Sequence, residues 1–286
     1  MPGYQSVMAA DSAALCEAIY AGELFHVGPT PASLALVDDV RDLLAGEFGS
    51  GDPRFAQARM DEVAFFEAIG RIRRTLFVDP HFHRRVVEVV AACGFDPAEV
   101  AFDPVRLRVV SHDGHHNPRA APIYYAHRDT WFALSQAVIA WWIALHDIPE
   151  EQTFAIYPDW FQRPIDNTSQ GFDYDAWAID HRDLKIGWQD RDAGKQVHYS
   201  GALGAFESGT SVRLAASRGD NVVFSGTHLH QTVGHSAGHT RFSLDFRMVR
   251  LPDHDAGKGP PNVDNRSRGA ATRDYVRGSS VVPRAA

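Results

Sequence analysis

Two short stretches place histidines and an aspartate where they could bind a metal. In "YYAHRDTWFA" (residues 124–133), His127 and Asp129 are two residues apart, and in "GTHLHQT" (residues 226–232), so are His228 and His230. Side chains two residues apart on a strand share a face. Burying a polar group without a partner costs roughly 2–7 kcal/mol, so these side chains are expected to have one. Two imidazoles and one carboxylate are the facial set that binds non-haem Fe(II).

This ligand set leaves coordination positions open, and open positions allow chemistry. O2 and a chelating cosubstrate need adjacent sites on the metal, whereas a closed four-ligand zinc site offers none. One His-x-Asp pair is weak support, because the chain has 15 histidines. The pattern is stronger because a histidine and then Arg-x-Ser follow about a hundred residues later. From the strand pattern alone, either His228 or His230 can supply the second imidazole.

The stretch "TRFSLDFRMV" (residues 240–249) alternates strictly between polar and apolar residues. Arg241, Ser243, Asp245 and Arg247 fall on one side, and Phe242, Leu244, Phe246 and Met248 on the other. We expect the apolar side to pack against helices or a second sheet, and the polar side to line solvent or an interior. A guanidinium there suits two-pronged binding of a carboxylate.

Composition argues for a folded globular protein rather than a nucleic-acid-binding or disordered chain. The 286 residues are 44% hydrophobic, 11% aromatic and 22% charged, with a net charge of −8. An acidic chain lacks the basic face that nucleic acid requires. Two cysteines, no secretory leader and no run of 18 apolar residues predict a cytoplasmic protein without a membrane partner. The Rossmann, P-loop and hydrolase-elbow motifs are all missing from the sequence.

The apolar period changes along the chain. Four segments within residues 10–95 carry apolar residues at helical spacing, with Asp11 and Asp61 as expected N-caps and Pro31 as an expected first helical residue. From about residue 105 the period becomes two, and seven short strands are expected, among them residues 121–133 and 209–216. We predict a mainly β fold with α: one domain over 1–286, with a mainly helical scaffold (1–104), a jelly-roll or cupin-like barrel (105–250) and a polar tail (251–286). The insertion at 161–205 is long enough to be a lid or substrate wall.

At this point the chain resembles the phytanoyl-CoA dioxygenase-like branch of the Fe(II)/2-oxoglutarate dioxygenases. The likeness covers roughly residues 105–250 and rests on "AHRDTW", "AWWIALHDIPEEQTFAIYP" and "GDNVVFSGTHLHQTVGHSAGHTRFSL". It implies a double-stranded β-helix and a metal site of His127, Asp129 and His230, since His230 precedes Arg241 by eleven residues. His228 is the rival ligand. For 2-oxoglutarate, the resemblance implies Arg241, Ser243, Thr232 and Trp142.

The resemblance implies a reaction in which 2-oxoglutarate, O2 and iron yield succinate, CO2 and an oxidant that removes a substrate hydrogen. Hydroxylation of a small-molecule metabolite in a biosynthetic pathway is the expected outcome. Desaturation, cyclisation, epoxidation or epimerisation by the same chemistry are alternatives, as is a non-catalytic metal-binding barrel that acts as a sensor or structural partner. A zinc or nickel isomerase is disfavoured by the downstream arginine. Expected substrate-lining aromatic residues are Tyr125, Trp131, Phe154, Trp160, Phe161 and Trp177. The substrate walls depart from the family pattern at "EEQTF" and "YPDWF", so an acyl-CoA substrate is not inferred.

Overall fold

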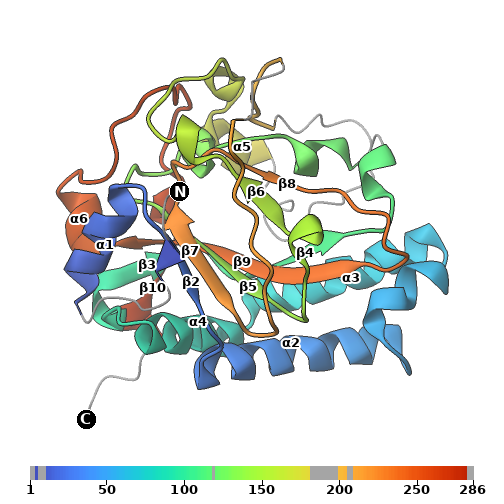
Figure 1. Ribbon diagram of the computed structural model, residues 1–286. Helices are drawn as coiled ribbons and strands as arrows, with labels where there is room; N and C mark the ends of the chain where they lie inside the picture. Colours follow the sequence, from blue (N-terminus) through green and yellow to red (C-terminus); the bar gives the residue numbers. More distant parts are fainter. Residues whose placement is uncertain (1–3, 6–10, 118–119, 181–198, 205–208, 282–286) are drawn as a thin grey trace, which may run out of the picture.

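Helices cover one side of a large, mostly antiparallel sheet, and a small second sheet lies across the other side (Figure 1). The structure is a computed structural model that describes residues 4–5, 11–117, 120–180, 199–204 and 209–281. In the described parts of the chain, no helix is both long and apolar enough to cross a membrane. The helices are α1 (Ser12–Tyr20), α2 (Pro31–Phe48), α3 (Glu62–Val78), α4 (Pro80–Ala92), α5 (Tyr174–Asp180) and α6 (Leu251–Asp255).

The large sheet is built around one long strand, β9 (Arg241–Arg250). Its order is β1-β2-β7-β5-β9-β3-β10, and β4 also pairs with β9, beside β3. The strands are β1 (Tyr4–Gln5), β2 (Leu24–Val27), β3 (Val100–Phe102), β4 (Arg106–Val110), β5 (Ile139–Ala144), β7 (Asn221–Ser225) and β10 (Val276–Arg277). The second sheet pairs β6 (Phe154–Ile156) with β8 (His230–Thr232). The described residues form no closed barrel.

The helix predictions are largely confirmed, because the local capping signals act as expected. Asp11 and Asp61 accept hydrogen bonds from the first-turn amides of α1 and α3, and Pro31 begins α2. The first predicted helical segment covered residues 11–25, which is longer than the helix found. It ends at Tyr20, and Leu24–Val27 form a strand of the large sheet instead.

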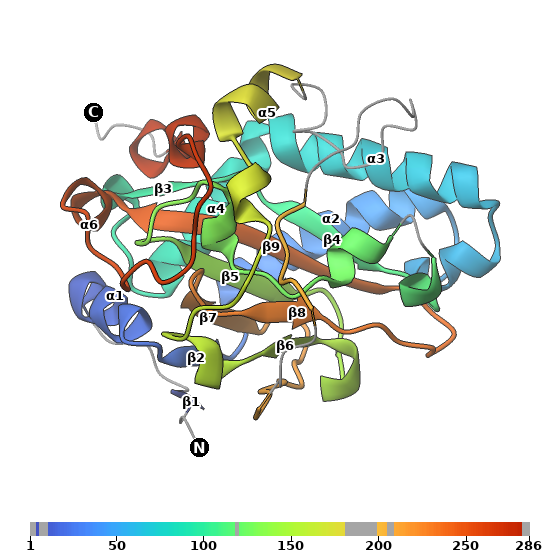
Figure 2. The same ribbon diagram turned by 90° about the horizontal axis from the view of Figure 1, so that it is seen from above.

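The two faces of the large sheet have different partners. Phe242, Leu244, Phe246 and Met248 of β9 pack with the apolar residues of α1–α4, as the alternation predicted. On β5, Trp141 faces the helices, whereas Trp142 faces β6. Figure 2 shows the same arrangement from above, with β6 and β8 opposite the helices. The polar residues of β9 therefore point into the space between the two sheets.

Two of the seven expected strands are absent from the fold. Residues 209–216 make only isolated bridges, through Val212 and Ala216, and residues 121–133 form short 3-10 helices around one bridge. The described parts of the 161–205 insertion contain a 3-10 turn and α5, while residues 181–198 and 205 lie outside the described residues. The tail passes back over the sheets and ends in β10, which pairs with β3.

Candidate metal centre

His127, Asp129 and His230 come together at one edge of the space between the sheets. One ligand atom from each lies within 4.8 Å of the others. The Nε2 atom of His127 is 3.9 Å from Oδ1 of Asp129, and the two imidazole centroids are 4.3 Å apart. The sequence therefore predicted a set of residues that the fold does bring together.

The local structure differs from the predicted strand. His127 pairs with His230 in an isolated antiparallel bridge, with both backbone N–H···O distances at 2.9 Å. Asp129 instead begins a short 3-10 helix, Asp129–Phe132. The prediction of a strand was wrong because the chain turns at Asp129, whose N–H donates to the carbonyl of Gly226 at 2.8 Å.

Gly226 makes this turn sterically feasible. A Cβ at this position would lie 2.5 Å from Cγ1 of Val138 and 3.1 Å from Cβ of Asp129. Real Cβ atoms essentially never show the shorter distance, so a side chain at position 226 would displace Val138 and crowd the side chain of Asp129. A glycine between two strand-like segments thus sets the position of the carboxylate.

Backbone carbonyls fix both imidazole rings. Nδ1 of His127 donates to the carbonyl of Tyr125, and Nδ1 of His230 donates to the carbonyl of His228, each at 3.0 Å. With Nδ1 protonated, Nε2 of each ring carries a free lone pair. This is the arrangement by which proteins orient metal-binding histidines.

The charge states also suit a metal. Burial, followed by the neighbouring His230, lowers the pKa of His127 to about 3, so its ring is neutral at pH 7. Burial alone would raise the pKa of Asp129, but the Arg247 guanidinium, with Nε 2.8 Å from Oδ1, and then the two imidazoles hold that pKa well below its usual range. Two neutral imidazoles and one ionised carboxylate fit a divalent transition metal.

His228, the rival ligand, lies elsewhere. It precedes β8 in a turn, where its N–H donates to the carbonyl of Ser225. Its ring is fully buried, 4.3 Å from the ring of Phe161 and 6.1 Å from that of Phe224. The ring of His228 is therefore not part of the three-residue cluster, although its carbonyl orients His230.

Arg241 is a buried cation near the start of β9. The residue is 2% exposed; one terminal nitrogen donates to Oγ of Ser243 at 2.8 Å, and the indole N–H of Trp142 donates to the same oxygen at 2.9 Å. The Nε atom has no hydrogen-bond partner within the part of the chain that the structure describes. Burial, and then Arg108, lower the pKa of Arg241 to about 10, so the side chain remains charged at pH 7.

The other arginines of β9 are each paired with acids. Arg247 binds Asp129 and Asp103, and Arg250 binds Glu99 and Asp253. Among the described residues, no carboxylate forms an ion pair with Arg241. A buried charge without a counterion is costly, so this position favours an anionic ligand.

Aromatic rings connect Arg241 with the histidine cluster. The Arg241 guanidinium is 6.0 Å from the ring of Trp142, and Phe154 follows at 5.3 Å from Trp142. Phe224 is next, with centroids 5.7 Å from Phe154 and 5.3 Å from His230. Thr232, also predicted to help bind the cosubstrate, lies on β8 opposite Phe154.

The remaining predicted aromatic residues have different surroundings. Tyr125 is 46% exposed, whereas Trp131 is fully buried and donates its indole N–H to Asp264. Phe161 is buried beside His228, and Trp177 packs near Phe172 and Tyr174 in a separate cluster. Their roles toward a substrate remain predictions.

The sequence analysis missed a buried ion pair behind the cluster. Arg128, between His127 and Asp129, points the other way and binds Asp264 of the tail, with Nε 3.1 Å from Oδ2. Its other nitrogens donate to the carbonyls of Trp160, Phe161, Arg163 and Thr227. The sequence contained one signal for this ion pair: Arg128 lies on the predicted strand face opposite His127, and a guanidinium buried there requires a counterion.

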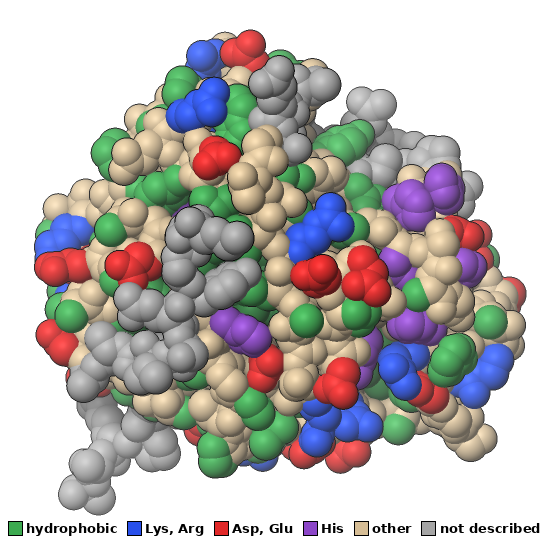
Figure 3. Space-filling view, in the orientation of Figure 1, with side chains coloured by type: hydrophobic (Ala, Val, Ile, Leu, Met, Phe, Trp, Pro, Cys, Tyr) green, Lys and Arg blue, Asp and Glu red, His purple; other side chains and the backbone are tan. Residues whose placement is uncertain are grey.

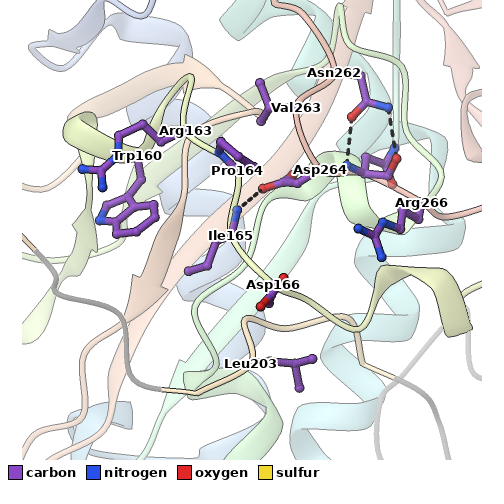
Figure 4. A pocket seen from close by; sticks show the side chains of 11 residues that line it. Trp160, Arg163, Pro164, Ile165, Asp166, Leu203, Asn262, Val263, Asp264 and Arg266 are labelled. Atoms are coloured by element: carbon purple, nitrogen blue, oxygen red, sulfur yellow. Dashed lines mark hydrogen bonds between the residues drawn. The ribbon is translucent and has the colours of Figure 1, made fainter.

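A pocket of about 630 Å³ lies beside this ion pair (Figure 4). Its walls come from Trp160, residues 163–166 and 262–266, and Leu203. Arg163 lies over the ring of Trp160 at 4.3 Å, and the N–H of Ile165 donates to Asp264 at 3.1 Å. The tail therefore forms part of a surface hollow as well as supporting the candidate metal centre.

Comparisons with known proteins give no family assignment. No protein-family model matches the chain, and no curated protein matches it. The solved structures similar to it include EvdO2 from Micromonospora carbonacea var. aurantiaca complexed with 2-oxoglutarate, at 13% identity over 86% of this chain and 94% of that chain, with a TM-score of 0.47. Two others come from nogalamycin biosynthesis. They are the non-heme alpha ketoglutarate dependent epimerase SnoN (16% identity, 83% and 84% coverage, TM-score 0.38) and carbocyclase SnoK (12%, 90% and 96%, TM-score 0.40). With identities below 25% and TM-scores below 0.5, these similarities decide neither the fold nor the reaction of this chain.

Proposed function

We propose that this chain is an Fe(II)- and 2-oxoglutarate-dependent oxygenase that hydroxylates a small-molecule metabolite in a biosynthetic pathway. The observation that carries the proposal is the convergence of His127, Asp129 and His230, with both Nε2 lone pairs free and the carboxylate ionised. These three residues would hold the iron. A facial set of this kind leaves the remaining positions open for a cosubstrate and O2.

The second support is the unpaired cation on β9. Arg241 would bind the distal carboxylate of 2-oxoglutarate, and Ser243 and Trp142 hold its guanidinium in place through a shared hydroxyl. Thr232 would contribute its hydroxyl from β8. Arg247 is already committed to Asp129, so it keeps the carboxylate ionised rather than binding the cosubstrate.

Iron held by these residues, with O2 and 2-oxoglutarate, would convert 2-oxoglutarate to succinate and CO2 and so supply an oxidant able to remove hydrogen from a carbon atom of the substrate. The protein orients the cosubstrate through Arg241 and excludes water with the rings of Phe154 and Phe224. Hydroxylation is the expected outcome, and desaturation, cyclisation, epoxidation or epimerisation would follow from the same site with a different substrate placement. Among the proposed substrate-lining residues, Tyr125 is exposed, and Trp160 and Trp177 are partly exposed.

The proposal extends to the fold and setting. The two packed sheets would be the halves of a double-stranded β-helix of the phytanoyl-CoA dioxygenase-like type, within a single domain over 1–286 that works in the cytoplasm. The N-terminal helices would be its scaffold.

An anaerobic titration tests the proposal. Adding Fe(II) and then 2-oxoglutarate to the metal-free protein is expected to produce a weak visible charge-transfer band. When air is admitted, the protein is expected to consume O2 only if both Fe(II) and 2-oxoglutarate are present. Asp129→Gly is expected to retain weak Fe(II) binding through the two histidines but to lose turnover. Wild-type turnover in Asp129→Gly would refute the ligand assignment. Metal binding without any 2-oxoglutarate-dependent O2 consumption would instead indicate a non-catalytic barrel.

A further inference from the structure

A second group of potential metal ligands lies on the surface, in the loop that follows β4. One ligand atom each from Asp113, His115 and His116 lies within 4.8 Å of the others, and all three residues are exposed. The imidazole centroids of His115 and His116 are 3.9 Å apart. Histidine side chains gather at the right of the surface in Figure 3.

The carboxylate of this group is held in place by residues outside it. The hydroxyl of Ser236 donates to Oδ1 of Asp113, and Nε2 of His112 lies 3.3 Å from Oδ2. His112 accepts the N–H of Gly238 at Nδ1 (3.2 Å), so its proton is on Nε2, facing the carboxylate. Ligating carboxylates in metal sites are oriented by such partners.

The imidazole of His115 is also positioned closely. A Cβ on Gly234 would lie 2.5 Å from Cγ of His115, so the His115 ring occupies the space that a side chain at position 234 would need. The edge of Tyr124 borders the same ring, with centroids 6.2 Å apart. Among the described residues, neither His115 nor His116 has a hydrogen bond to its ring, which leaves their nitrogens available as ligands.

We propose that Asp113, His115 and His116 form a second metal site, which binds Zn²⁺ with water completing the coordination. Two imidazoles and a carboxylate are ordinary zinc ligands, and the chain's charge of −8 favours cation binding. The site is exposed, unlike the largely buried centre around His127, and the two share no residue.

A metal at this site would order one loop, and hydrogen bonds join this loop to a second one. Asp113 is bonded to Ser236, and its N–H donates to the carbonyl of His235 at 3.0 Å. The segment 233–240 joins His230, the candidate ligand, to Arg241, the candidate cosubstrate residue. Zn²⁺ on the Asp113 loop would therefore restrict the connection between the two parts of the proposed active site.

Zinc stoichiometry tests the proposal. Metal-free protein is dialysed against Zn²⁺ and the bound metal is counted, with circular dichroism as a check on folding. We expect two equivalents for wild type and one for His115→Ala/His116→Ala. The matched control is His81→Ala/His83→Ala, which removes two histidines from α4 and is expected to keep both equivalents.

The two metal sites are separated by a further variant. His127→Ala/His230→Ala is expected to bind one equivalent, and all four substitutions together none. A wild type that binds one equivalent, lost only in the His127/His230 variant, would overturn the second site and leave the first intact. Two equivalents retained by His115→Ala/His116→Ala would also overturn it.

Discussion

Removing the tail carboxylate at Asp264 is expected to damage both folding and the metal centre. The Arg128 side chain is 1% exposed and that of Asp264 is 5% exposed, so the ion pair is shielded from water. Breaking such a pair by removing one partner typically costs about 3–5 kcal/mol. The Asp264 carboxylate also accepts the indole N–H of Trp131 at 2.8 Å and the backbone N–H of Ile165.

The size of the effect follows from these contacts. Four backbone carbonyls continue to solvate the guanidinium of Arg128, which offsets part of the loss. The two orphaned N–H donors add about 1 kcal/mol each. We therefore expect Asp264→Ala to lower the free energy of unfolding by about 4 kcal/mol. Asp264→Asn, which keeps an acceptor but not the charge, is expected to lose about 2 kcal/mol.

The assay is urea unfolding followed by fluorescence of the six tryptophans, paired with an Fe(II) titration. Because Arg128 stands between His127 and Asp129, Asp264→Ala is also expected to weaken iron binding about tenfold or more. Glu47→Ala is the matched control. It breaks the more exposed pair with Arg71, where the cost should stay below about 1 kcal/mol with iron affinity unchanged. An Asp264→Ala protein within about 1 kcal/mol of wild type would refute the reasoning.

Three further predictions concern the site and its pH dependence. His230→Ala is expected to abolish iron binding while His228→Ala largely preserves it; loss of iron in the His228 variant alone would contradict the ligand assignment. Arg241→Leu removes one side of a charge-assisted contact worth about 2–5 kcal/mol, so 2-oxoglutarate affinity should fall roughly 30-fold or more. Arg250→Leu is the control: Arg250 pairs with Glu99 and Asp253 at the far end of β9, so its loss should leave 2-oxoglutarate saturation unchanged. Equal saturation curves for the two variants would refute the role of Arg241. Burial lowers the pKa of His146 to about 4, and its Nε2 accepts a β9 backbone N–H. Below pH 6.5 the unfolded chain therefore binds more protons than the folded chain. The free energy of unfolding should fall as the pH drops from 6.5 toward 4, by up to about 2 kcal/mol at pH 5. The urea midpoint should change less steeply with pH in His146→Gln than in wild type. An equally steep change would show that His146 does not cause this pH dependence.

The sequence was most informative where local rules decide the structure. Alternation along β9 correctly separated its apolar face from the face that carries Arg241 and Arg247, because a strand must send neighbouring side chains in opposite directions. The caps of the N-terminal helices followed for the same reason. The grouping of His127 and Asp129 with a later histidine was also anticipated from residue type and spacing, while the choice of His230 over His228 came from the family resemblance.

Two-residue spacing gave a wrong prediction of a shared strand face where the chain turns. His127 and Asp129 have the separation of a strand pair, yet Asp129 begins a 3-10 helix that depends on close approach to Gly226. His228 and His230 have the same separation, and a turn ending before β8 sends the His228 ring away. Contacts with residues remote in the sequence decide both the turn at Asp129 and the direction of the His228 ring, so neither can be predicted from the local residue pattern.

The Arg128 and Asp264 pair also bears on when the metal centre is completed during synthesis. The two residues are 136 positions apart, so Asp264 leaves the ribosome long after the residues on either side of Arg128. Until then, a buried guanidinium next to two of the three candidate ligands has no counterion. Closing so long a loop is slow compared with forming local helices. A chain shortened before residue 264 would thus contain every candidate iron ligand but lack the counterion of Arg128, so tight metal uptake would indicate that synthesis has passed residue 264.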